Sequence, residues 1–168
     1  MNEYSEHNAE EIKYRPIGVI NSPFDEPVNM PIQSAAASGI CGKVEIYDKF
    51  VGGLKDIDGF SHIILLYAFH KSEGYKLQVK PFLEDVVHGV FAVRAPKRPN
   101  SIGFSIVKLI KVEENILHIE NVDILNGTPL LDIKPYVPGF DCFPEAVSGW
   151  VENHREKISS KKSDDRFV

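Results

Sequence analysis

The feature that most constrains this chain is a series of short apolar runs, interrupted by eleven prolines and twelve glycines. In the run GKVEIY at 42–47, apolar Val44 and Ile46 alternate with charged residues, which is the period of a half-buried β-strand. The run at 60–70 is apolar almost throughout and predicts a strand buried on both faces. Further strands are expected at 15–22 and 88–93.

Two longer alternating segments, 105–112 and 115–125, flank a short polar stretch and predict a β-hairpin. Helical signals are weak and short, at 48–54 and at 144–157, where Pro144 suits a first helical turn. Many short strands with frequent turn residues favour a mainly β fold, either a barrel or a sandwich, with a few short helices.

The length of 168 residues, with 43% hydrophobic and 26% charged residues, is that of one ordinary globular domain. Residues 1–13 lack periodicity and predict a flexible N-terminal tail. Residues 155–168 alternate charge and serine with little to bury, and they predict a charged flexible C-terminal tail. One compact body is therefore expected over 14–154.

The composition excludes several classes of protein. The longest apolar run, IILLYAF, is far shorter than a membrane span, and the acidic N-terminus is unlike a signal peptide, so a cytoplasmic protein is expected. Cys41 and Cys142 have no metal-ligand spacing, which indicates neither a zinc site nor a disulfide framework. The net charge of −5 argues against non-specific coating of nucleic acid, although a local basic site is compatible with it.

A basic segment carries the first candidate site. Arg94, Lys97 and Arg98 are interleaved with two prolines, which restrain the backbone and reduce the entropy lost on binding. Such cations can hold a carboxylate or a phosphate. The alternative is a surface loop whose cations pair with nearby acids such as Glu84 and Asp85.

A second polar segment, LNGTPLLDIKPYVPGFD at 125–141, begins with an Asn-Gly turn that can point backbone groups at a ligand. Beyond it, Asp132, Lys134 and Tyr136 alternate with apolar residues, so an extended chain places all three on one side. They predict either a polar site or a simple Lys–Asp pair on an edge strand.

Two weaker candidates complete the set. The stretch PIQSAAASGICG at 31–42 is small and polar, typical of a mobile loop or a plain connector. His70 and Lys71 end a buried strand, either at the rim of a site or merely at the edge of the core. A neutral imidazole is the expected form of this histidine near pH 7.

Several of these stretches occur together and in a distinctive order. The relevant words are IGVINSP at 17–23, PIQ at 31–33, GFSHI and FHK between 59 and 71, GVFAVRAPKRPNSIGFS at 89–105, and NGTPLLDIKPYVP at 126–138. In wording and spacing, over 16–141, the chain resembles the TrmO (YaeB-like) methyltransferases.

The resemblance implies an S-adenosylmethionine-dependent enzyme built on a small antiparallel β-barrel, acting as a homodimer and without a metal. The absence of a glycine-rich nucleotide fingerprint agrees with such a fold. The implied substrate is the tRNA anticodon loop, where N6-threonylcarbamoyladenosine next to the anticodon receives a methyl group on N6. Two alternatives stay open: a module that binds S-adenosylmethionine or another nucleotide without methylating RNA, and a small-molecule methyltransferase.

The resemblance also implies a cofactor pocket. Its residues would be Pro31, Ile32, Gln33, His70, Lys71, Arg94, Phe104, Asn126, Gly127, Thr128 and Pro129.

From residue type, Asp132, Lys134 and Tyr136 are the candidate catalytic groups, with Asn100 orienting the substrate base. Lys97, Arg98 and Lys134 are expected to contact RNA phosphate. The chain departs from the family pattern at Asn126, where aspartate is common, and at Ser101, where proline is frequent. It ends soon after the expected barrel, which predicts a compact archaeal-type member.

Overall fold

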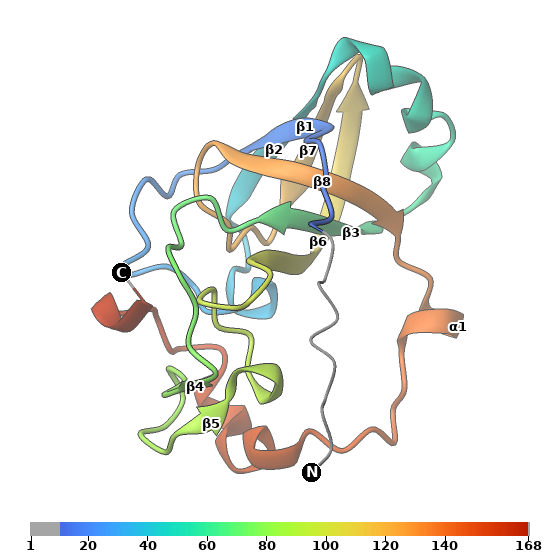
Figure 1. Cartoon of the computed structure of the whole chain (residues 1–168). Coiled ribbons are helices and arrows are strands. Elements are labelled where there is room, and N and C mark those ends of the chain that lie inside the picture. The colour runs from blue at the N-terminus through green and yellow to red at the C-terminus, as the bar shows by residue number, and fades with distance from the viewer. Residues whose placement is uncertain (1–10, 168) are drawn as a thin grey trace, which may run out of the picture.

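Six antiparallel strands close into a barrel in the computed structural model, which describes residues 11–167 (Figure 1). Neighbouring strands follow the order β1-β2-β7-β6-β3-β8. Their bounds are β1 Gly18–Asn21, β2 Cys41–Ile46, β3 His62–Ala68, β6 Ile102–Glu113, β7 Ile116–Glu120 and β8 Thr128–Pro135. The mainly β prediction and the hairpin at 105–125 are thereby confirmed.

The remaining elements are short. A two-stranded sheet, β4 Gln78–Val79 with β5 His88–Gly89, lies at the opposite end of the molecule from the barrel (Figure 1). The other segments hold short helices: η1 Ser34–Ala36, η2 Asp48–Leu54, η3 Ile57–Gly59, η4 Val90–Ala92, α1 Pro138–Asp141, η5 Gly149–Lys157 and η6 Asp165–Phe167.

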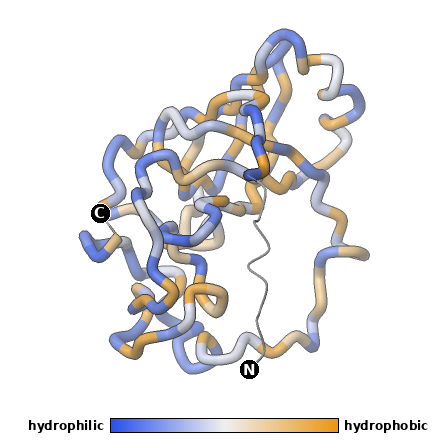
Figure 2. Tube along the Cα trace, in the orientation of Figure 1, coloured by the Kyte–Doolittle hydropathy of each residue, from blue (hydrophilic) through white to orange (hydrophobic). Residues whose placement is uncertain are grey.

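The alternating pattern of the sequence fills the barrel. Along β6, Val107 and Leu109 point into the core while Lys108 and Ile110 stay exposed, and Figure 2 shows this alternation of hydropathy along the strands. In β3 the consecutive residues 63–65 are all buried, as the continuous apolar run predicts. At one position of this β3–β6 pair the residue is glycine, so no Cβ atom occupies the space beside the facing side chain.

That position is Gly103, which pairs directly with Tyr67 across the two strands. A Cβ atom built on Gly103 would lie 2.0 Å from the Tyr67 ring, a distance that no side chain tolerates. The ring of Tyr67 therefore packs directly against the backbone of Gly103, and it is buried in the barrel core. Glycine is required here for close approach and not for an unusual backbone angle.

The strand predicted at 88–93 is wrong beyond its first two residues, because η4 follows β5 immediately. The reason is that side chains, and not a neighbouring strand, donate hydrogen bonds to the backbone carbonyls of this segment. Arg98 Nη1 donates to the carbonyls of Val90 and Val93, at 3.0 and 2.7 Å. Trp150 Nε1 donates to the carbonyl of Ala92 at 2.9 Å. Side chains thus satisfy acceptors that a strand partner would otherwise take.

The helix predicted at 144–157 is shortened to η5, and α1 forms at 138–141 without having been predicted. Pro138 occupies the first position of α1, where its missing N–H is not needed. The predicted helix at 48–54 is present as the 3-10 helix η2.

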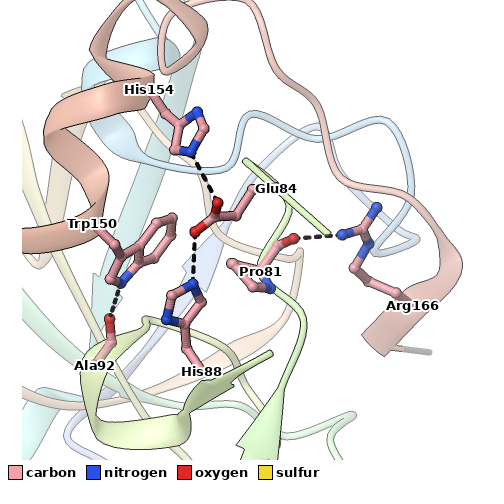
Figure 3. A network of polar contacts seen from close by, with 7 residues as sticks. All are labelled: Pro81, Glu84, His88, Ala92, Trp150, His154 and Arg166. Carbon is pink, nitrogen blue, oxygen red and sulfur yellow. Dashed lines mark hydrogen bonds and ion pairs between the residues drawn. The ribbon is translucent and has the colours of Figure 1, made fainter. Parts of the chain in front are cut away.

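Glu84 joins the small sheet to η5, as Figure 3 shows. Its carboxylate accepts hydrogen bonds from Nε2 of His88 at 2.6 Å and from Nε2 of His154 at 3.1 Å. The ring of His88 also stacks on Trp150, with centroids 4.6 Å apart. The hydrogen bonds from His88 and then His154 hold the pKa of Glu84 below its usual range. Glu84 is therefore engaged with these two histidines.

The solvated tail predicted for 155–168 is wrong where the structure describes it. Ser163 is buried, its N–H donates to the carbonyl of Met30, and its carbonyl accepts from the N–H of Asn29, both at 2.9 Å. Arg166 donates to the carbonyl of Pro81, and other contacts include a bridge between Pro31 and Lys162 and an edge-to-face pair of Phe82 with Phe167. Backbone hydrogen bonds and the ring of Phe167 therefore anchor this segment, although its composition is typical of a solvated tail.

Most of the predicted N-terminal tail, residues 1–10, lies outside the described residues, and 11–13 are exposed and without regular structure. Across 11–167, none of the helices is long and apolar enough to cross a bilayer.

Replacing Gly103 with alanine tests the contact with Tyr67. We expect a loss of about 1–3 kcal/mol in the free energy of unfolding, because the new methyl group must displace a buried ring. Denaturant titration measures it. Gly52→Ala is the matched control, since nothing lies within 4 Å of its Cβ position, and its stability should change little. Equal stability of both variants would contradict the close packing.

Candidate functional site

A cavity of about 600 Å³ opens at the end of the barrel where β3 ends and β6 begins. Its walls come from segments far apart in the sequence: the loops around 30–33 and 91–98, the end of β3, the residues after β7, and the C-terminal segment 163–167. The Tyr67–Gly103 pair forms part of this wall. Eight of the eleven residues predicted for the cofactor pocket line it: Pro31, Ile32, Gln33, His70, Lys71, Arg94, Phe104 and Thr128.

Arg94 links two of the predicted segments. Its Nη1 donates to Oε1 of Gln33 at 2.8 Å, and its guanidinium lies 5.5 Å from the ring centre of Phe104. The stretch at 31–42 is therefore more than a connector, because its first residues meet the basic segment at the cavity. Arg94 itself stays exposed, so its other N–H groups are available to a ligand anion.

His70 and Thr128 meet across the mouth of the barrel. The hydroxyl of Thr128 donates to the carbonyl of Leu125 at 2.7 Å, so it accepts from Nδ1–H of His70 at 3.3 Å. Partial burial, and then the neighbouring charge of Lys71, lowers the pKa of His70. The imidazole is thus neutral near pH 7, as expected, with Nε2 as an acceptor.

The three other residues predicted for the pocket, Asn126, Gly127 and Pro129, do not line the cavity. Asn126 instead fastens the loop that follows β1: its Oδ1 accepts from the N–H of Ser22 at 3.2 Å and its Nδ2 donates to Asp25 Oδ1 at 3.0 Å. Gly127 has a φ of 73°, which favours glycine. In this chain these residues shape the turn that presents Thr128.

The predicted catalytic group lies elsewhere. Lys134 Nζ and Asp132 Oδ2 are 2.8 Å apart, which is the simple Lys–Asp pair that the sequence left open. Asp132 borders a separate hollow of about 430 Å³, and neither it, Lys134, Tyr136 nor Asn100 lines the main cavity. The physical reason is strand length. Because β8 leaves the cavity at Thr128, Asp132 lies roughly 13 Å further along the strand.

Of the three residues predicted to contact RNA phosphate, Arg98 lines the cavity, whereas Lys97 and Lys134 do not. The guanidinium of Arg98 is partly used within the fold, on the carbonyls of Val90 and Val93, and lies 6.0 Å from the ring centre of Phe91. Lys97 is half-buried beside it.

Sequence reasoning missed three linked polar residues: Tyr67 and Asp123, which line the cavity, and Ser105, which is buried and hydrogen-bonded to both. Ser105 Oγ donates to Asp123 Oδ1 at 2.7 Å and accepts from the hydroxyl of Tyr67 at 3.0 Å. Burial raises the pKa of Asp123 to about 6, and burial followed by the charge of Asp123 raises the pKa of Tyr67 far above its usual range. The available signal was an acid set between two apolar residues, Val122 and Ile124, three positions before the Asn-Gly turn.

Among residues 11–167, no cluster of three or more histidine, cysteine or acidic side chains could hold a metal ion. Cys41 and Cys142 are free and exposed.

The model of the tRNA-methyltransferase O N-terminal domain matches residues 19–142, which include the barrel and most of the cavity wall. The chain belongs to this TrmO family. A "Probable S-adenosyl-L-methionine-binding protein" of Pyrococcus abyssi is 54% identical over 156 residues, covering 93% of this chain and 85% of that protein.

Two further similar proteins are longer than this chain. The mouse "tRNA (adenine(37)-N6)-methyltransferase" is 36% identical over 87% of this chain, which spans only 35% of the mouse protein. A crystal structure of TrmO from Pseudomonas aeruginosa superposes with a TM-score of 0.71 and 37% identity, covering 83% of this chain and 62% of that one. The TrmO fold is therefore shared, while each of these longer proteins contains residues with no counterpart in the alignment.

The C-terminal segment extends the cavity wall beyond both the matched TrmO residues and the body predicted to end at 154. The hydroxyl of Ser163 accepts from the N–H of Met30 at 2.9 Å in a buried position. Ser163→Ala leaves that N–H without its partner, and we expect the docking of this segment to weaken by about 1–3 kcal/mol. Hydrogen exchange at the amides of Asn29, Met30 and Ser163 should become roughly five- to a hundredfold faster.

Ser159→Ala is the control for this change, because Ser159 is exposed in the same segment. Unaltered protection in both variants would contradict a docked C-terminal wall.

Proposed function

We propose that this chain binds S-adenosylmethionine in the 600 Å³ cavity and methylates N6 of threonylcarbamoyladenosine next to the anticodon of tRNA. The observation that carries the proposal is the convergence of three distant segments on one cavity, at Gln33, Arg94 and Phe104. These segments are among the words that resemble TrmO, and the family match covers all of them.

The residues present fit the cofactor chemically. The cavity has the size of a small-molecule site and mixes apolar walls with a few polar groups. Arg94 can hold a carboxylate, the ring of Phe104 can pack on a flat heterocycle, and neutral His70 offers an acceptor at Nε2. Once bound, S-adenosylmethionine supplies an electrophilic methyl group on a sulfonium.

Exposed side chains at the cavity mouth support an RNA substrate. Phe91 is 78% exposed, Ile102 43% and Phe104 40%, although all three line the cavity. The guanidinium of Arg98 lies close to the ring of Phe91. Unpaired bases of RNA loops stack on exposed aromatic rings and arginine planes, and phosphates bind nearby cations. Such a mouth suits a splayed anticodon-loop base better than a small solute.

A homodimer is part of the proposal. The segment after β8 carries Phe140, Phe143 and Val147, which are 75%, 71% and 85% exposed. Figure 2 shows the hydrophobic stretches of this segment, which runs apart from the barrel. Exposed apolar side chains gathered on one segment are typical of a protein interface. The proposed substrate, tRNA, also implies work in the cytoplasm.

The second candidate is a module that binds S-adenosylmethionine without methylating RNA. The name of the Pyrococcus abyssi relative, a probable S-adenosyl-L-methionine-binding protein, favours it. A small-molecule methyltransferase is the third. Transfer of methyl groups to tRNA separates the first proposal from both alternatives.

Arg94→Ala tests the cofactor site. Losing a charged hydrogen-bond donor should weaken S-adenosylmethionine binding roughly ten- to a hundredfold, measured by calorimetric titration. Lys43→Ala is the control, since Lys43 is exposed on β2 and does not line the cavity. Full affinity in Arg94→Ala would exclude this cavity as the cofactor site, and no binding by the folded wild-type protein would reject the proposed cofactor.

Lys97→Ala tests the path of the RNA backbone. A lysine that neutralises one phosphate should, on removal, reduce the salt-dependence slope of tRNA binding by about 0.7 to 0.9. Filter binding across a range of KCl concentrations measures the slope, again with Lys43→Ala as control. An unchanged slope would mean that the RNA lies along another face.

The modified nucleoside itself is tested with two tRNA preparations, one carrying and one lacking the threonylcarbamoyl group. Methyl transfer only to the first supports the proposed substrate. Equal transfer to both would move the acceptor elsewhere, and transfer to neither would favour the binding module.

A further inference from the structure

The carboxylate of Asp123 lines the cavity, and none of the sequence motifs described above includes it. We propose that Asp123 is the base that takes the proton from the acceptor nitrogen during methyl transfer, an inference that rests on the proposed function above. Asp123 follows β7 and lines the cavity together with Tyr67, while Ser105, which links the two side chains, is buried.

The hydrogen-bond chain fixes the orientation of this carboxylate. Because the hydroxyl of Ser105 donates to Asp123 Oδ1, its oxygen must accept the proton of the Tyr67 hydroxyl. Each group has one role, so the chain Tyr67–Ser105–Asp123 has a single direction. Tyr67 cannot turn away, since its ring is held over the backbone of Gly103. The base is thereby positioned before any ligand arrives.

The groups facing Asp123 come from every neighbouring element. They are the Tyr67 hydroxyl from β3, the Ser105 hydroxyl from β6, the Ser34 amide from η1 and, at longer range, the Arg94 charge from the basic segment. Burial raises the pKa of Asp123 to about 6 against the opposing effect of Ser105, the backbone amides and Arg94. A carboxylate with this pKa is mostly ionised at pH 7 yet more basic than an ordinary aspartate.

The other titratable groups of the cavity suit the task less. Asp164 accepts hydrogen bonds from Nε and Nη2 of Arg166, both at 2.7 Å, and from the Arg166 N–H at 3.1 Å, and these bonds lower its pKa. Glu26 is exposed at the rim. Tyr67 stays protonated because burial raises its pKa. His70 is the competing base, and the experiment below separates it from Asp123.

The acceptor nitrogen is conjugated with the purine ring and the carbamoyl carbonyl, so it is a weak nucleophile until it loses its proton. Its N–H bond breaks and the proton goes to the Asp123 carboxylate. The freed electron pair forms the new N–C bond to the methyl group, and the pair of the broken S–C bond stays on sulfur. Asp123 then returns its proton to solvent, which restores the carboxylate.

Three variants test this role. In Asp123→Asn, the single-turnover rate of tRNA methylation should fall roughly 10²- to 10⁴-fold, while calorimetric affinity for S-adenosylmethionine stays nearly unchanged. In Ser105→Ala, the carboxylate loses a donor that stabilises its charged form, so the rising limb of the pH–rate profile should move to higher pH. Asp58→Asn, an exposed acid in η3, is the matched control and should retain both rate and profile.

Titration of carboxyl ¹³C resonances in the protein without ligand gives an independent readout. The Asp123 resonance, identified by its absence in Asp123→Asn, should titrate near pH 6, and its midpoint should rise in Ser105→Ala. A limb that stays in place in Ser105→Ala while the ¹³C midpoint rises would assign the base to another group, His70 first. Full activity of Asp123→Asn with the wild-type profile would also overturn the inference.

These failures differ from failure of the proposed function. If the wild-type protein transfers no methyl group to tRNA carrying threonylcarbamoyladenosine, the proposed function is rejected, and the role of Asp123 falls with it. If the wild type is active and Asp123→Asn equals it, the function stands and only the base is reassigned.

Discussion

The packing of one tyrosine ring on one glycine holds together the core and the cavity of this molecule. Tyr67 and Gly103 pair across β3 and β6, and the ring occupies the space that any other residue at 103 would need. The same ring ends the hydrophobic core and forms part of the cavity wall. Its hydroxyl begins the chain through Ser105 to Asp123. Barrel packing and the orientation of the candidate base therefore depend on a single contact.

The basic segment illustrates why a net-negative chain concentrates cations beside prolines. Arg98 donates to carbonyls of η4 and so fixes the curve of the segment from within. Arg94, a few residues earlier, reaches across to Gln33 and leaves its remaining donors exposed to the cavity. One arginine shapes the segment and the other faces the ligand. Restraint of this kind lowers the entropy lost when a ligand binds.

Much of the barrel was predictable because period-two alternation is a local signal, and the core strands follow it closely, as Val44 and Ile46 do. The resemblance of short sequence motifs to the TrmO family predicted one pocket containing Gln33, Arg94 and His70, and all three line the same cavity. The errors have non-local causes. Arg98 and Trp150 donate to the backbone carbonyls of 90–93, where η4 forms instead of the predicted strand. A backbone hydrogen bond between Met30 and Ser163 holds the charged C-terminal segment in place. Asp132 was predicted to be catalytic from its residue type. In the structure it lies further along β8 than Thr128 and does not line the cavity. Asp123 was missed because only folding places it beside Ser105.

The docked segment at 163–167 is part of the site. Ser163 and Phe167 line the cavity while they hold the loop at 29–31 and the ring of Phe82. A ligand that fills the cavity then binds the docked form in preference to an undocked one, so its apparent affinity is scaled by the docked fraction. Linkage requires the reverse as well: occupancy of the cavity tightens the hold on the chain end by the same factor. Ligand binding in the cavity and docking of the segment at 163–167 are thus thermodynamically coupled.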